Sequence, residues 1–248
     1  MRHLFRCTSS LLLAIAPAQG FAAPAQEAPV AADNAPVRQD ALELAQLLNP
    51  TEPLMTLAAR TMDESFDKGL TAEGAAALEK KYPGFVAALR SAVRDVTIAK
   101  LRADMPIMHR RYAQLFAENL KPEEVAELIE FYRSPTGARI IQAKFSNFDV
   151  SGLTERIAKD DSAISADDFS AVNETTTQGM WKGMSADDMR AVMTFGLRPA
   201  AKKLNQMAPK LAEIEAEMAN EPDPELEAAV DTASRKVYKR FGVERPDE

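Results

Sequence analysis

Residues 120–137, LKPEEVAELIEFYRSPTG, predict two helices and the break between them. The first half places apolar residues at the i, i+3, i+4, i+7 spacing of one buried helical face: Val125, Leu128, Ile129 and Tyr132. Ser134-Pro135 follows. Because the residue before a proline resists the helical conformation, the first helix is expected to end at about Arg133. Ser134 can then cap the second helix, with Pro135 in its first turn.

Similar patterns cover most of the chain, and very few segments alternate as a strand would. Helices are expected at about 40–48, 52–68, 72–81, 84–118, 122–133, 135–148, after Ser165, after Ser185, and at 198–220 and 224–241. Pro106 lies inside one of them and is the candidate point for a kink or split. We therefore expect an all-α fold of about eight or nine helices, in antiparallel hairpins around one or two cores.

The helix–break–helix pattern has a candidate second copy. A shift of 64 residues lays residues 184–206 over residues 120–142, so that Phe131 meets Phe195 and Pro135 meets Pro199. One interpretation is a degenerate duplication, with the second copy at about 165–220. The other is that two amphipathic helices with a proline break align by composition alone. Both remain open at the level of sequence.

The N-terminal residues predict export. Arg2 and Arg6 precede the short apolar run 11–16, and small residues follow, which is typical of a signal peptide over residues 1–22. The run is too short to span a bilayer. Residues 23–38 are rich in Ala and Pro and predict a flexible tether, which leaves 39–248 as the helical domain. We expect a periplasmic protein, with secretion as the open alternative.

Composition narrows the classes of partner and of chemistry. Loss of Arg2 and Arg6 with the signal peptide would lower the formal charge from −7 to −9, which disfavours nucleic acid as a partner. The only cysteine, Cys7, lies in the same segment, so the mature chain is expected to lack disulfides and thiol chemistry. One basic cluster complements the C-terminal end of the last predicted helix: Arg235, Lys236, Lys239 and Arg240.

The segment EEVAELIEFYRSPTG, from Glu123 to Gly137, resembles the signature of a bacterial exported family known as domain of unknown function 2059. The resemblance extends over about residues 95–150. It implies a helical exported protein and transfers no catalytic residue. Each signature residue also has an explanation in helix capping or packing.

The inventory of reactive side chains is small. His109 is the only histidine outside the predicted signal peptide. Met105, Met108 and His109 could offer soft donors to copper(I), but an apolar core stripe is the preferred interpretation. The same choice applies to Met180, Met184, Met189 and Met193. Four glutamates are expected on a solvated helix face: Glu123, Glu124, Glu127 and Glu130. We predict no catalytic, cofactor-binding or metal-binding residue, and no cofactor.

Three functional hypotheses follow. The first is a non-enzymatic exported protein that acts by contact with other proteins or envelope components, with self-association as a further option. The second is a module that binds an apolar small molecule between helices near Phe131, Tyr132 and Trp181. The third is an enzyme that uses carboxylates on a helical scaffold, in the manner of a cell-wall hydrolase. It requires a close pair of buried acids in one cleft.

Overall fold

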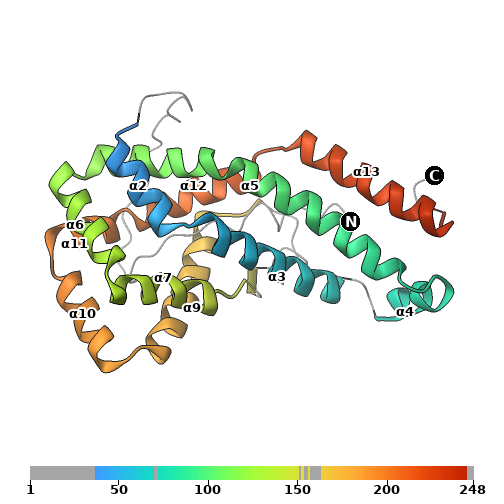
Figure 1. Ribbon diagram of the computed structural model, residues 1–248, viewed down its shortest axis with the longest axis horizontal. Helices are drawn as coiled ribbons and strands as arrows, with labels where there is room; N and C mark the ends of the chain where they lie inside the picture. The colour runs from blue at the N-terminus through green and yellow to red at the C-terminus, as the bar shows by residue number, and fades with distance from the viewer. Residues whose placement is uncertain (1–36, 70–71, 151, 154–155, 157–162, 245–248) are drawn as a thin grey trace.

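A computed structural model describes residues 37–69, 72–150, 152–153, 156 and 163–244. Within these ranges every regular element is a helix, which confirms the all-α prediction (Figure 1). The elements are α2 (Gln39–Leu48), α3 (Thr51–Gly69), α4 (Ala72–Lys81), α5 (Phe85–Asn119), α6 (Pro122–Arg133), α7 (Pro135–Asn147), α9 (Ala166–Gly183), α10 (Ala186–Gly196), α11 (Pro199–Gln206), α12 (Ala208–Asn220) and α13 (Pro224–Phe241). The predicted signal peptide lies outside the described residues.

Local capping accounts for where several helices begin. The Ser165 hydroxyl accepts a hydrogen bond from the Asp168 backbone N–H, and the Ser185 hydroxyl accepts one from Asp188 N–H. Ser134 does the same for α7 by accepting from Gly137 N–H at 3.1 Å. Each bond satisfies one of the donors that the first helical turn leaves free. The serine and proline signals in the sequence therefore located these helix starts.

Two predicted helices differ in detail. The helix expected at 198–220 is two helices that meet at Met207. Pro209 has no N–H with which to continue the hydrogen-bond ladder, so a new helix begins there with the proline in its first turn. By contrast, α5 runs through Pro106 without interruption.

The long helix α5 is the axis of the molecule. Its N-terminal half packs against α13, and its C-terminal half packs against α2, with α3 beside both (Figure 1). The buried apolar residues form two clusters, one along each half of α5. The smaller joins the N-terminal half of α5 to α13, where the Phe85 ring makes edge contacts with Tyr238 and Phe241.

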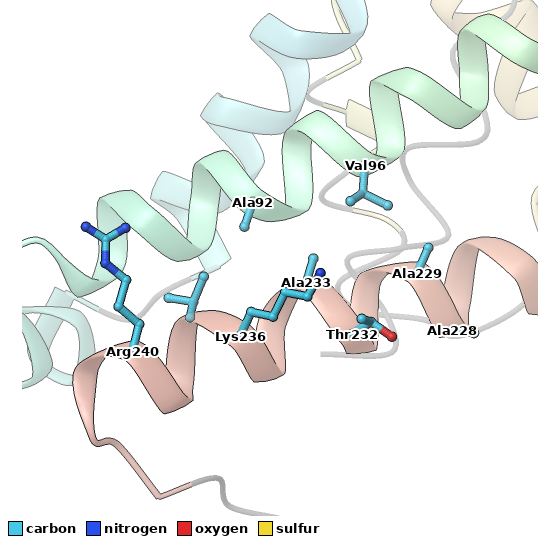
Figure 2. Close-up of a pocket in the computed structure, with 9 residues that line it drawn as sticks. Ala92, Val96, Ala228, Ala229, Thr232, Ala233, Lys236 and Arg240 are labelled. Carbon is cyan, nitrogen blue, oxygen red and sulfur yellow. The ribbon is translucent and has the colours of Figure 1, made fainter.

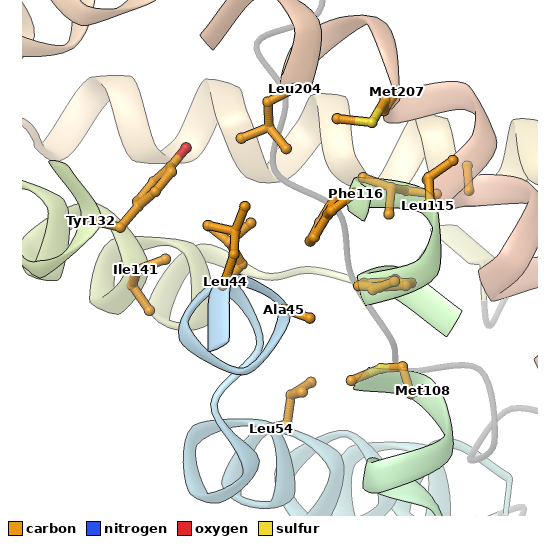
Figure 3. Close-up of a cluster of buried hydrophobic side chains, with 14 of the residues drawn as sticks. Leu44, Ala45, Leu54, Met108, Leu115, Phe116, Tyr132, Ile141, Leu204 and Met207 are labelled. Atoms are coloured by element: carbon orange, nitrogen blue, oxygen red, sulfur yellow. The ribbon is translucent and has the colours of Figure 1, made fainter. Parts of the chain in front are cut away.

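The larger core holds α2, α6, α7, α9, α11 and α12 around the C-terminal half of α5. Figure 3 shows Leu44 of α2 between Tyr132 of α6 and Phe116 of α5. Arg38, at the end of the predicted tether, donates a hydrogen bond from Nη1 to the Leu120 carbonyl at 3.0 Å and so fixes the start of α2. No helix in the described ranges is long and apolar enough to cross a membrane.

Candidate functional site

The signature residues form a tight helix–helix corner. A Cβ atom at Gly137 would lie 2.2 Å from the Phe131 carbonyl oxygen and 2.5 Å from the Tyr132 Cα. Only glycine allows the start of α7 to approach the end of α6 this closely. Ser134 N–H donates to the Phe131 carbonyl at 3.0 Å and completes the turn. These residues set the angle between two helices.

Three aromatic rings fill this corner. The Phe131 ring stacks on Phe195 of α10, with centroids 3.6 Å apart and an angle of 3° between the planes. Tyr132 meets Phe195 edge-on at 6.2 Å. The hypothesis of an apolar ligand here needs a cavity at these rings. The rings fill the space with one another, and neither of the two hollows described below is lined by them.

Two ion pairs flank the stacked rings. Lys203 of α11 lies 2.7 Å from a carboxylate oxygen of Glu124 on α6. Arg139 of α7 lies 2.5 Å from Asp188 at the start of α10, and Thr136 also donates to this carboxylate. The Arg139 hydrogen bond, followed by that of Ser185, holds the pKa of Asp188 well below its usual range. The signature therefore makes a specific contact with α10 and α11.

A cluster of buried polar side chains lies deeper in the same core. The Tyr112 hydroxyl on α5 donates to Glu215 Oε1 on α12 at 2.5 Å. Lys144 Nζ on α7 lies 3.2 Å from Asn49 Oδ1 after α2, and His109 Nε2 lies 2.7 Å from the Asn49 carbonyl. The second Glu215 oxygen is buried without a hydrogen-bond partner. The cluster joins four helices.

Burial shifts the ionisation of this cluster. Lys144 and Glu215 are each only 1% exposed. Desolvation raises the pKa of the Glu215 carboxyl to about 8, although the Tyr112 hydrogen bond and the Lys144 charge oppose the change. Desolvation also lowers the pKa of the Lys144 amine to about 7, against the attraction of Glu215. Such shifts are frequent at catalytic sites, but a catalytic site also needs access for a substrate.

No access to Lys144 or Glu215 is evident in the described part of the chain. A hollow of about 370 Å³ beside α2 and α5 is lined by His109 but by no other member of the cluster. A second hollow, of about 610 Å³, lies between α5 and α13, where Lys236 and Arg240 border Ala92 and Val96 (Figure 2). The hydrogen bonds of the buried cluster join α2, α5, α7 and α12, and sequence reasoning did not find this cluster.

The other candidate residues lie apart from this cluster. Glu123 and Glu130 are exposed, whereas Glu124 and Glu127 pair with Lys203 and Arg198. Met105 and Met108 are buried in the larger core, as the core interpretation predicted. No group of three or more His, Cys, Asp or Glu side chains that could hold a metal ion occurs among the described residues.

One surface contradicts the expectation that the methionines fill the core. Met180 is buried, but Met193 on α10 is 68% exposed and Leu197, which follows α10, is 71% exposed. The two lie four residues apart, so they share one helix face. Trp181, named above in the hypothesis of an apolar ligand, is half-buried near the end of α9. An apolar face of α10 is therefore open to solvent.

Comparison with known proteins yields one match. No curated protein and no solved structure matches the chain. The resemblance proposed from the signature is confirmed over a segment that contains His109, Tyr112, Lys144 and the whole corner from α6 to α7. Residues 107–144 match the family described as "Uncharacterized protein conserved in bacteria (DUF2059)".

Proposed function

We propose that this protein is a non-enzymatic, exported helical protein that acts by binding other proteins, and that α10 carries the binding surface. The observation behind the proposal is the exposed pair Met193 and Leu197. Large apolar side chains that remain in water on one helix face favour a binding surface over a structural role, because burying them releases free energy.

The polar groups of the core support the same proposal. Lys144 and Glu215 have the ionisation expected of reactive groups, but they are enclosed by the helices that they join. The hydrogen bonds of Lys144 and Glu215 are all accounted for by a role in holding α2, α5, α7 and α12 together. An enzyme would need a route for substrate to these groups.

Export to the periplasm is part of the proposal. Its support is the basic, then apolar, then small-residue order of residues 1–22. N-terminal sequencing of the protein recovered from the envelope tests it directly. A protein that still begins at Met1 contradicts export through a cleaved signal peptide.

Affinity capture tests the binding function. The tagged mature protein is compared with the variant Met193→Lys/Leu197→Lys, which places two charges on the exposed face. The matched control is Ala126→Lys/Ala138→Lys, which adds the same charge at exposed positions on α6 and α7. We expect the wild type and the control to recover a partner that the α10 variant loses. Recovery of the same proteins by all three contradicts the proposal, as does recovery of none.

A further inference from the structure

The structure contains two copies of one three-helix unit, related by the 64-residue offset. The helices α5 and α9 end at Asn119 and Gly183, α6 and α10 begin at Pro122 and Ala186, and α7 and α11 begin at Pro135 and Pro199. In each of these three pairs the two helix termini are separated by the same 64 residues. The backbone agrees as well, since Ser134 has φ −65° and ψ 159° and its counterpart Arg198 has φ −71° and ψ 146°.

The equivalence also holds inside the core. Four residues of α5 and their four counterparts on α9 are all buried: Met105, Met108, Tyr112 and Phe116, and Phe169, Val172, Thr176 and Met180. The second copy therefore begins at about residue 166, as the duplication hypothesis predicts for its start near 165.

The contacts between the two copies are reciprocal. Arg139 of the first copy pairs with Asp188 of the second, and their counterparts, Lys203 and Glu124, pair with each other. Phe131 stacks on its own counterpart, Phe195. This reciprocity is the mark of a two-fold symmetric interface. Alignment by composition alone does not produce it, so the duplication is the better interpretation.

One element breaks the symmetry. Helix α2 packs on α5 and α6 of the first copy and buries Ala41, Leu44, Ala45 and Leu48 there. Its Glu43 pairs with Arg133 at the end of α6 at 2.5 Å. Beneath this helix the α6 stripe is buried, with Ile129 only 9% exposed.

The second copy has no counterpart of α2 among the described residues. The residue that corresponds to Ile129 is Met193, and the one that corresponds to Arg133 is Leu197. Both are the exposed residues of α10. The exposed face therefore corresponds to the part of α6 that α2 covers in the first copy, whereas α9, the counterpart of α5, is covered by α12 and α7.

We propose that the exposed face of α10 binds one amphipathic helix of a partner protein, in the way that α2 binds α6. This proposal rests on the proposed function and names the kind of partner. The partner helix carries Leu and Ala at the i, i+3, i+4, i+7 positions, as α2 does. Because Leu197 stands in place of Arg133, the partner is apolar where α2 carries Glu43.

The probe is a synthetic peptide with the sequence of residues 38–49 and the change Glu43→Leu, added to the mature chain of residues 23–248. Binding is followed by fluorescence anisotropy of the labelled peptide. We expect one peptide per chain, with weaker binding of the peptide that keeps Glu43. The variant Met193→Lys/Leu197→Lys should weaken binding by roughly tenfold or more, because it places charges in the apolar contact.

Controls separate this site from others. The variant Ala126→Lys/Ala138→Lys should bind as the wild type does, and circular dichroism should show that both variants remain folded. If the variant Met193→Lys/Leu197→Lys binds the peptide as tightly as the wild type does, the peptide has displaced α2 from α6. That result overturns the proposal. Binding of the chain to phospholipid vesicles, lost in the α10 variant while the peptide fails to bind, overturns it in favour of a lipid surface.

If the peptide does not bind, the proposal that the partner is an amphipathic helix is also overturned. The proposed function still stands if affinity capture recovers a protein that depends on Met193 and Leu197. If the peptide does not bind and affinity capture recovers no protein that depends on Met193 and Leu197, both the proposed function and the helix-binding proposal are contradicted.

Discussion

Replacing Glu215 with glutamine should stabilise the protein, and the gain should depend on pH. The pKa of Glu215 is raised from 4.5 to about 8 by burial. The folded state therefore holds a proton that the unfolded state releases above pH 4.5. The contribution of this group to stability is complete below pH 4.5 and is lost as the pH rises through 8. Glutamine is neutral throughout and avoids that loss.

The size of the effect follows from the same pKa difference. Each pH unit above 4.5 costs the wild type about 1.4 kcal/mol, so Glu215→Gln should gain about 3 kcal/mol at pH 6.5 and nothing at pH 4.5. Lys144, with a pKa of about 7, is still mostly protonated in this window. Urea denaturation of residues 23–248 at several pH values measures the gain. Glu213→Gln, on the exposed face of α12, is the control.

A loss of stability in Glu215→Gln would contradict a protonated Glu215 in the folded protein. If Glu215 is ionised and paired with Lys144 in the folded protein, glutamine leaves a buried ammonium group without its counter-charge. Removing one partner of a buried pair in this way costs about 3–5 kcal/mol. A destabilised Glu215→Gln protein at pH 6.5 would therefore establish an ion pair in the core.

Three further predictions concern the corner and its interface. Gly137→Ala should destabilise the protein by at least about 2 kcal/mol in urea denaturation, because the new Cβ would overlap backbone atoms of α6, whereas Gly196→Ala, with open space around it, should be neutral or slightly stabilising. A double-mutant cycle with Phe131→Leu and Phe195→Leu should give a coupling free energy of about 0.5–1.5 kcal/mol, and additive losses would mean that the stacked rings do not interact. An NMR titration should find the Asp188 carboxyl ionised below the usual pH range of an aspartate, and an ordinary pKa would show that its hydrogen bonds do not persist in solution.

The helices were predictable because their signals are local. Ser134, Ser165 and Ser185 cap helices with their own neighbours, and Pro122, Pro135, Pro199 and Pro224 each stand in the first turn of a helix. The split at Met207 was missed because the regular apolar spacing from Leu204 to Met218 continues across it. In that case backbone chemistry at Pro209 outweighed side-chain periodicity.

The buried cluster was not predicted because it depends on tertiary contacts. Lys144 and Glu215 come close only when α7 and α12 pack together. The sequence around either residue does not indicate that the other is its neighbour in the fold. A signal was present, since both charged residues stand among buried positions of their helices, beside Ile141 and Leu211. A charged side chain in an apolar stripe indicates a buried partner elsewhere.

The open face of α10 escaped prediction for a related reason. The apolar residues of α6 and α10 follow the same spacing, and both predict a buried face. Only the position of α2 decides that one face is covered and the other is exposed. The sequence offered the duplication as one of two interpretations. The absence of a second helix like α2 over α10 became evident only from the arrangement of the helices.

Site-specific photo-crosslinking in the native envelope shows whether the exposed face of α10 binds a helix of another protein. A photoreactive residue replaces Met193 on the open face in one protein and Ala126 on the opposite copy in another. We expect one protein adduct from position 193 that position 126 does not give, and we expect the crosslinked partner peptide to come from an amphipathic helix. No adduct from position 193, or identical adducts from both positions, would contradict it.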